Sequence, residues 1–251
     1  MKESLEKAAA HISAGQPLAA GDIAVLAETN DILTLGMLAD EARRRRHGTD
    51  TTFVRVADVQ APLPDESSID IPVAAREVRV IGRADSFDVL LPHLCRIVEA
   101  AGGVPVSAFS LEALEAEAAV SGRRLADLLA AMRDTGVARV ADAALDQLQH
   151  AELSLEQVRN AGLGLARLTV QHTASTTARL EHIIRARSLQ QSLGWIESFA
   201  PLGRSWKPDS PSTGYDDVRQ VALARLLIDN IASIQVEWAR YGPKLAQVAL
   251  L

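Results

Sequence analysis

The alternation of short β-rich runs with helical ones, from residue 52 onward, constrains the fold of this chain more than any other feature. The β-rich runs predict six strands, at Thr52–Val59, Glu77–Gly82, Val104–Phe109, Val137–Ala141, Leu165–Val170 and Ser198–Leu202. Apolar spacing predicts helices at Phe87–Ala101, Leu111–Ser121 continuing through Arg124–Thr135, Ser154–Ala161, Thr176–Leu193, Tyr215–Ala232 and Gln235–Leu250. This order is typical of parallel strands joined by right-handed crossovers.

Six strands with outer helices predict an α/β fold, a partial (β/α)6 TIM-like barrel in place of the complete eight-stranded one. The first fifty residues differ, because they predict only helices. The last of these begins at Asp31, an N-cap residue, and ends at Gly48. We therefore expect an N-terminal helical extension over residues 1–50, and a partial barrel with C-terminal helices over residues 51–251.

One predicted crossover is unusually short. Val59 and Glu77 are separated by QAPLPDESSIDIPVAAR, which contains three prolines and an acidic patch. A parallel connection usually needs a helix, and this segment has room for a short one at most. The sequence indicates that part of this connection has been lost.

Composition excludes several classes of protein. The chain has 251 residues, a net charge of −6 and a pI near 5.5, which argues against a nucleic-acid surface. No run approaches the roughly 18–20 apolar residues of a membrane span, and no signal peptide is recognisable. We expect a cytoplasmic protein without a nucleic-acid or membrane partner.

The cysteine count limits the chemistry further. Cys95 is the single cysteine, so an internal disulfide, a redox pair or a cysteine-based zinc site cannot form. Its apolar helical surroundings predict a buried core thiol, with a reactive nucleophile as the weaker alternative. The GxGxxG, P-loop, HExxH and GxSxG patterns do not occur, which removes the common nucleotide-binding and hydrolase interpretations.

Several segments together resemble a known family. They are DILTLGMLADEARRRRHG (31–48), EVRVIG (77–82), AFSLEAL (108–114), QHTASTTARLEHIIRARSLQ (171–190), SFAPL (198–202) and the last 39 residues from TGYDDVRQ. They resemble the radical-SAM family of aminodeoxyfutalosine synthase, dehypoxanthine futalosine cyclase and the FO synthase subunits, and aminodeoxyfutalosine synthase most closely. The resemblance implies a radical-SAM type of barrel and a relation to menaquinone biosynthesis by the futalosine pathway.

The resemblance also implies a [4Fe–4S] cluster, held by a CxxxCxxC loop after the first strand, and bound S-adenosylmethionine (SAM). The corresponding segment here, Gln60–Arg76, contains no cysteine, and Cys95 cannot replace three thiolate ligands. The family's glycine pair after the second strand is Gly82 followed by Arg83, whose side chain would crowd SAM and repel its positive charge. We therefore expect no cofactor.

Further family positions have changed as well. RVADAAL (139–145) replaces a glycine-rich segment, and Gln171 and Ala174 replace a family glycine and glutamate. The family chain continues past the position of Leu251, so a late part of the fold is expected to be missing.

Other positions carry family residues. His172 and Glu112 are the predicted catalytic residues, and the predicted ligand-binding residues are Arg79, Gly82, Asp229 and Asn230. A hydrogen-bonded remnant of the ancestral pocket is an equal interpretation of His172. His172, Glu112 and Asp142 could converge as metal ligands, but spacing alone supports this weakly, and we expect no metal.

These observations favour a degenerate, non-catalytic paralogue that binds a small molecule or a partner, either an intact family member or a second copy of itself. One alternative is a cluster-independent enzyme that uses His172 and Glu112. The other is a functioning futalosine-pathway enzyme. A separate question concerns Arg43–Arg46, for which a solvated helix end that complements the helix dipole is the main interpretation. A phosphate-binding patch is the alternative.

Overall fold

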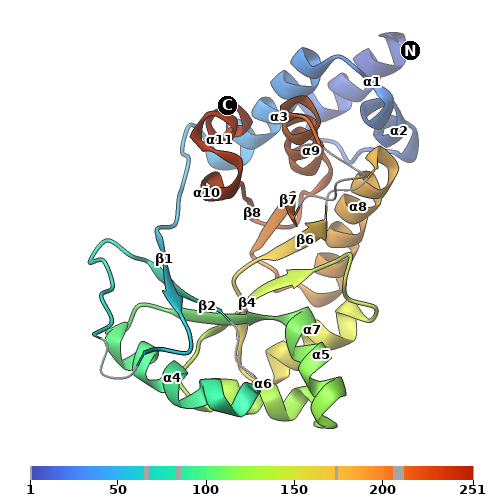
Figure 1. Cartoon of the computed structure of the whole chain (residues 1–251). Coiled ribbons are helices and arrows are strands. Elements are labelled where there is room, and N and C mark those ends of the chain that lie inside the picture. Colours follow the sequence, from blue (N-terminus) through green and yellow to red (C-terminus); the bar gives the residue numbers. More distant parts are fainter. Residues whose placement is uncertain (1, 65–67, 83–85, 173–174, 206–211, 251) are drawn as a thin grey trace. The chain divides into compact units, whose positions relative to one another are not determined.

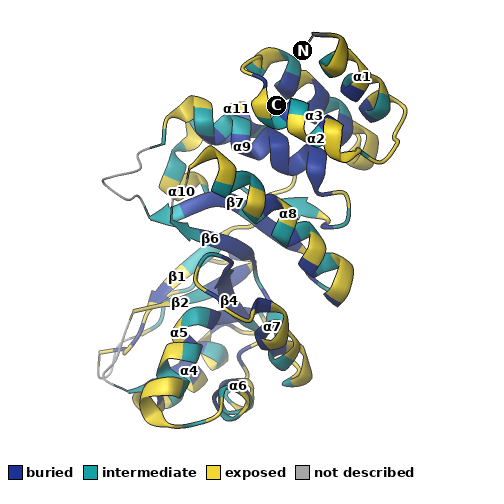
Figure 2. Cartoon of the chain, turned by 90° about the vertical axis from the view of Figure 1, so that its right-hand side faces the viewer, coloured by how far each residue is buried: buried dark blue, intermediate teal, exposed yellow. Residues whose placement is uncertain are grey.

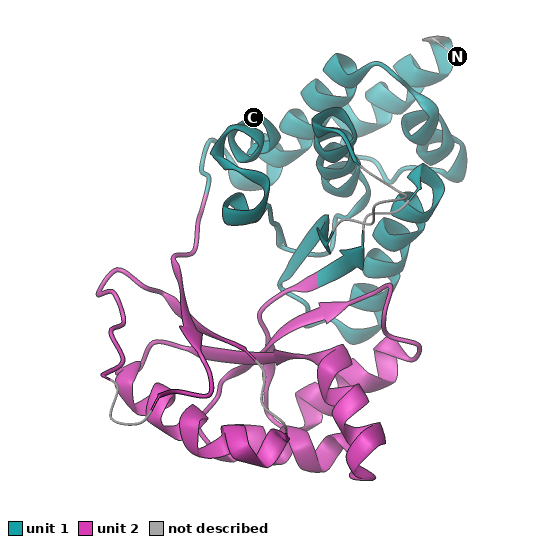
Figure 3. Cartoon of the chain, in the orientation of Figure 1, with its two compact units in different colours: residues 1–51, 169–251 teal, residues 52–168 magenta. Residues whose placement is uncertain are grey.

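The computed structural model describes residues 2–64, 68–82, 86–172, 175–205 and 212–250. The chain divides into two compact units, Met1–Thr51 with Thr169–Leu251, and Thr52–Leu168 (Figure 3). The unit boundary after Thr51 is adjacent to the predicted one, but the N-terminal helices group with the C-terminal part of the chain. The predicted division into an extension and a barrel stays a prediction. Within the part of the chain that the structure describes, no helix is both long and apolar enough to cross a membrane.

The unit Thr52–Leu168 contains a parallel sheet flanked by helices (Figure 1). The strands β1 to β4 are neighbours in chain order, and β5 pairs with β4. Asp58 of β1 lies opposite Arg79 of β2, which lies opposite Ser107 of β3. The elements are β1 (Val56–Gln60), β2 (Glu77–Ile81), α4 (Phe87–Ala100), β3 (Val106–Ser110), α5 (Leu111–Ser121), α6 (Leu125–Asp134), β4 (Arg139–Ala144), α7 (Ala151–Asn160) and β5 (Gly164–Leu165).

Apolar side chains at helical spacing attach the helices to this sheet. In α4, Leu90, Leu94 and Ile97 are buried, while Cys95 is exposed. Successive residues of a helix point about 100° apart, so the residue after Leu94 turns away from the core. The predicted buried thiol is therefore wrong. The connection from β1 to β2 contains no helix among its described residues 61–64 and 68–76, as its composition predicts.

The other unit combines three strands with the remaining helices. Its order is α1 (Lys2–Ser13), α2 (Ala20–Glu28), α3 (Ile32–His47), β6 (Leu168–His172), α8 (Thr176–Leu193), β7 (Ser198–Ser205), α9 (Gly214–Leu227), β8 (Ser233–Ile234), α10 (Trp238–Tyr241) and α11 (Pro243–Leu250). The strand β7 lies between β6 and β8 and runs parallel to β8. Helix α9 contacts α3, α8 and α11 and is buried over most of its length (Figure 2).

Three predicted helices differ from the structure. The helix predicted over Tyr215–Ala232 ends at Leu227. The helix predicted over Gln235–Leu250 is interrupted at Gly242, with φ of 81°, and the one predicted over 111–135 is interrupted at Gly122, with φ of 70°. Gly122 adopts the left-handed conformation that commonly ends a helix, and Gly242 has a positive φ that glycine adopts more readily than other residues. The predicted N-cap Asp31 is confirmed, because its carboxylate accepts a hydrogen bond from Thr34 N at 3.0 Å.

Candidate functional site

The carboxyl ends of β1 to β4 form one edge of the sheet, where α/β proteins commonly bind ligands. Three predicted residues belong to this part of the chain. Arg79 lies in β2, Gly82 follows the end of β2, and Glu112 lies in the first turn of α5, directly after β3.

Gly82 is in close contact with the preceding strand. Its φ is 112°, and a Cβ atom placed on it would lie 2.1 Å from Ala61 O and 2.1 Å from Gln60 Nε2. The Ala61 amide donates to Ile81 O at 2.7 Å, which holds the two strand ends together. Glycine is therefore required here by the chain's own packing, and the space beside its Cα is filled by Ala61 and Gln60.

The end of β3 carries backbone strain. Phe109 has φ of 54°, which makes it the one non-glycine residue with positive φ among the described residues. Such a conformation costs on the order of 1–3 kcal/mol and often occurs at functional sites. The Phe109 ring packs on Phe87, with ring centroids 5.3 Å apart. This bend leads β3 directly into α5, whose N-cap is Ser110.

The bend places Glu112 against the neighbouring strand. Glu112 Oε2 accepts a hydrogen bond from Ala144 N, at the end of β4, at 3.3 Å. A carboxylate in the first turn of a helix is also stabilised by the helix dipole. Glu112 is thus a positioned, half-buried carboxylate at the carboxyl edge of the sheet.

Arg79 makes a different kind of contact. Its guanidinium binds both carboxylate oxygens of Asp58, at 2.8 and 3.1 Å, across the parallel pair β1–β2. A bidentate pair of this kind fixes the orientation of both side chains. Arg79 therefore contributes to the register of the two strands.

A buried charged cluster lies within the mostly apolar interior of this unit. Arg167 pairs with Asp142 at 2.9 Å and with Glu77 at 3.2 Å, and the Ser107 hydroxyl donates to Glu77 at 2.6 Å. The side chains of Arg167, Asp142 and Glu77 are at most 10% exposed. This cluster was not predicted from the sequence. Charges within the apolar strands EVRV and RVADAA were a usable signal, because buried charges are nearly always paired.

Asp142 was one of three residues considered as metal ligands with His172 and Glu112. In the structure, Asp142 forms an ion pair with Arg167. Across the described residues, no group of three His, Cys, Asp or Glu side chains is arranged to hold a metal ion.

His172 is the last residue of β6 and is half-buried. The neighbouring Gln171 is held by Ser205 of β7. The side-chain amide of Gln171 donates to Ser205 Oγ at 3.3 Å, and the backbone carbonyl of Gln171 accepts from that hydroxyl at 3.0 Å. Two positions that the resemblance singled out, Arg83 and Ala174, lie outside the described residues. The catalytic roles of His172 and Glu112 stay predictions.

Asp229 and Asn230 lie in the segment between α9 and β8. Asp229 binds Arg187 of α8 at 3.1 and 3.3 Å, and Asn230 Nδ2 donates to the Arg187 carbonyl at 2.9 Å. The structure thus brings these two predicted residues together around one arginine, before the start of β8. His172 instead lies at the end of β6, so these residues belong to different strand ends of their unit.

Comparisons with known proteins give relatives of two kinds, although no model of a protein family matches the chain. An aminodeoxyfutalosine synthase from Thermus thermophilus is 28% identical over 94% of this chain and 78% of its own length. A 5-amino-6-(D-ribitylamino)uracil–L-tyrosine 4-hydroxyphenyl transferase from Methanosphaerula palustris is 24% identical over 100% of this chain and 85% of its own length.

Solved structures support the fold. HydG, a maturase of the [FeFe]-hydrogenase, superposes with a TM-score of 0.66 at 9% identity, covering 100% of this chain and 66% of HydG. HydG from Carboxydothermus hydrogenoformans gives a TM-score of 0.65 at 11% identity over 99% of this chain and 68% of HydG. The predicted α/β partial-barrel fold is therefore confirmed. The predicted resemblance is confirmed as well, because the chain is similar to aminodeoxyfutalosine synthase and to the tyrosine 4-hydroxyphenyl transferases.

Proposed function

We propose that this protein is a non-catalytic member of the radical-SAM-like group, which binds a small molecule or a partner protein and carries out no radical chemistry. The observation that carries the proposal is the donor set. A radical-SAM cluster needs soft, deprotonated sulfur ligands, three of them in the CxxxCxxC loop that the resemblance implies. The chain has one cysteine, and Cys95 lies on the exposed face of α4. The residues present do not fit a [4Fe–4S] cluster.

The packing of Gly82 supports the same proposal. In the family the corresponding glycine pair would leave room for SAM. Here the space beside the Cα of Gly82 holds Ala61 and Gln60. The strand end therefore has a structural reason to keep its glycine that is independent of SAM.

The length of the alignments is a third line of support. The alignment with the Methanosphaerula palustris transferase runs over 309 positions and includes 100% of this chain, which has 251 residues. The relative therefore contains internal segments that have no counterpart here. The short connection between β1 and β2, where the resemblance places the cluster loop, is consistent with such a loss.

Anaerobic reconstitution tests the proposal. The purified protein is incubated with Fe²⁺, sulfide and a reductant, and desalted; iron, sulfide and cleavage of SAM to 5′-deoxyadenosine are then measured. We expect no stoichiometric iron and no 5′-deoxyadenosine, while the Thermus thermophilus aminodeoxyfutalosine synthase, treated in parallel, gains both. Stoichiometric iron and sulfide together with SAM cleavage would overturn the proposal.

The binding role needs its own measurement. Thermal unfolding is followed in the presence of SAM, nucleosides or an intact aminodeoxyfutalosine synthase, because any species that binds only the folded state raises Tm. We expect a concentration-dependent rise with one of these species, or a mass in sedimentation experiments that exceeds one chain. A monomer whose Tm responds to none of them would contradict the binding role.

A further inference from the structure

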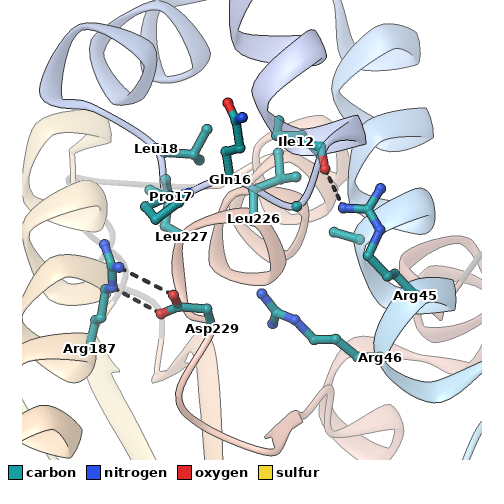
Figure 4. Close-up of a pocket in the computed structure, with 12 residues that line it drawn as sticks. Ile12, Gln16, Pro17, Leu18, Arg45, Arg46, Arg187, Leu226, Leu227 and Asp229 are labelled. Carbon is teal, nitrogen blue, oxygen red and sulfur yellow. Dashed lines mark hydrogen bonds and ion pairs between the residues drawn. The ribbon is translucent and has the colours of Figure 1, made fainter.

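A pocket with an excess of positive charge lies within the unit that contains both chain termini. It has a volume of about 260 Å³ and is bounded by the connection from α1 to α2, by α3, by α8 and by the end of α9 (Figure 4). Its charged residues are Arg45, Arg46, Arg187 and Asp229. Neither Glu112 nor His172 lines it.

Two of the three arginines have carboxylate partners. Arg45 binds Glu41 at 3.0 Å, and it also donates to the backbone carbonyls of Ile12 and Ser13. Arg187 binds Asp229 through two hydrogen bonds. These contacts balance the charges of both side chains.

Among the described residues, Arg46 has no carboxylate partner of this kind. It donates one hydrogen bond, from Nη1 to the carbonyl of Ile228 at 2.7 Å, and no carboxylate among the described residues forms an ion pair with it. Figure 4 shows its side chain extending from α3 towards Asp229. Burial lowers the pKa of Arg46, and Arg187 and Arg45 lower it further, against the opposing effect of Asp229. The field at this guanidinium therefore favours an additional negative charge.

Apolar side chains also line the pocket. They are Ile12, Pro17, Leu18 and Ala42, together with Leu226 and Leu227 from the end of α9. Small-molecule sites commonly combine an apolar wall with a few polar groups that fix the orientation of the ligand. A volume of this size is small for such sites, which limits the ligand to a compact molecule.

We propose that this pocket binds a small organic anion, whose carboxylate or phosphate group binds Arg46 and whose apolar part packs against Leu226 and Leu227. A guanidinium donates parallel hydrogen bonds to either oxyanion, so the chemistry is the same for both. The inference is independent of the loss of radical chemistry, because none of the pocket residues belongs to the carboxyl edge of β1 to β4.

The competing explanation is structural. Arg44 to Arg46 occupy the last turn of α3, where cations stabilise the helix dipole, and Arg45 and Arg46 donate to carbonyls of other segments. On that explanation the pocket would show no preference for a negative charge. The test therefore compares ligands of similar size that share an apolar ring and differ in charge.

Benzoate and benzyl alcohol form such a pair, and phenyl phosphate against inorganic phosphate tests the apolar part. Each is titrated into the full chain, and the ¹H–¹⁵N shifts of the Arg46 side chain and of the Gly15 and Gln16 amides are followed. We expect saturable shifts with benzoate and phenyl phosphate, with weaker binding of benzyl alcohol and inorganic phosphate. Equal binding of benzoate and benzyl alcohol, or no saturable shift with any probe, would overturn the proposal.

Two variants locate the anion. Arg46→Gln should weaken benzoate binding at least about tenfold, since a hydrogen bond to a charged group contributes that much. Arg44→Gln removes the same charge from the same helix turn, but Arg44 pairs with Asp40 at 2.6 Å and does not line the pocket. It should bind benzoate as the unmodified chain does, and equal losses in both variants would contradict the site.

For a third variant we expect tighter binding of benzoate, a result that misfolding would not produce. Asp229→Asn removes the carboxylate that competes for Arg187 and repels an incoming anion. We expect benzoate to bind several-fold more tightly, with a larger shift of the Arg46 side chain. Unchanged or weaker binding in a variant that folds would contradict the proposed position of the anion.

Discussion

Arg225 of α9 is a buried cation that forms no ion pair with a carboxylate of the described residues. Its residue surface is 9% exposed, and within the described parts of the chain it makes no hydrogen bond or ion pair. Burial lowers its pKa to about 10, with a further lowering by Arg43 and an opposing effect of Asp40. The side chain therefore stays charged at neutral pH, in an environment that disfavours the charge.

Replacing Arg225 with Met should stabilise the protein. The variant keeps a long side chain and removes the buried charge, so we expect a gain of about 1–3 kcal/mol in urea unfolding. The folded-state pKa lies below the unfolded one, so the penalty is present at neutral pH and decreases as pH rises through about 10. The exposed Arg44 serves as the control, since Arg44→Met should change stability little. A loss of stability in Arg225→Met would show that the charge has a stabilising role.

Gly82 offers a second test at the residue scale. Gly82→Ala places a methyl group against Ala61 and Gln60. Alanine also disfavours the positive φ that the backbone has at this position. We expect a loss of more than about 2 kcal/mol in the free energy of unfolding.

Gly122→Ala is the matched control for Gly82→Ala. Its φ is also positive, at 70°, but no atom lies within 4 Å of the added methyl group. It should lose only about 1 kcal/mol, the cost of the backbone conformation. Equal losses in the two variants would mean that the contact with β1 contributes nothing.

At the scale of elements, α9 depends on its capping box. The Thr213 hydroxyl accepts a hydrogen bond from Asp216 N at 3.2 Å, and the Asp216 carboxylate accepts from the Thr213 amide at 3.0 Å. The Thr213 hydroxyl, followed by its amide, holds the pKa of Asp216 below its usual value. Because α9 contacts the helices α2, α3, α8 and α11, its first turn contributes to the stability of the whole unit.

Thr213→Ala should therefore cost about 1 kcal/mol at neutral pH. The pKa of Asp216 is lower in the folded state than its ordinary value of 3.8. The capping box therefore stabilises the protein fully above pH 3.8, and this stabilisation is lost as pH falls through the folded-state pKa. The difference between the variant and the unmodified chain should narrow in that range, measured by urea unfolding at several pH values. Ser175→Ala removes the N-cap of α8, which has Ala178 at the third helical position and no carboxylate there. Its cost should not follow that pH dependence.

The elements were largely predictable because each has a local cause. Each of the six predicted strands overlaps an observed strand, with bounds that differ by up to four residues, and α8 has its predicted bounds of Thr176–Leu193. The strands β5 and β8 escaped prediction because two residues carry no periodic pattern. The end of α9 at Leu227 also escaped, because Asp229 and Asn230 leave the helix to bind Arg187, a residue 42 or 43 positions away.

The candidate sites were less predictable, because they depend on contacts between residues that are far apart in the sequence. Gly82 and Glu112 were singled out by the family resemblance, at the end of one predicted strand and shortly after another. The partners of a side chain could not be predicted, because they come from distant segments: Glu77 lies 90 positions from Arg167. The pocket at Arg46 likewise depends on helices that a linear sequence does not place side by side.

At the scale of the whole molecule, the two units differ in the contacts found in their interiors. The unit Thr52–Leu168 is organised around Arg167, Glu77 and Asp142, whereas the other unit packs its helices around α9. Removing one partner of a buried ion pair typically costs about 3–5 kcal/mol, because the remaining charge is left uncompensated. Arg167→Met would leave two buried carboxylates without their cation.

Amide hydrogen exchange can show whether the units unfold independently. In Arg167→Met we expect lower protection of amides in β2, β3 and β4, while amides of α9 and α3 retain theirs, because regions with separate cores can open separately. Arg187→Met removes a half-exposed pair with Asp229 in the other unit and should leave β2 to β4 unchanged. Equal loss of protection in α9 and in the strands would mean that the two units unfold as one cooperative body. In that case the charged cluster at Arg167 would limit the stability of the entire chain.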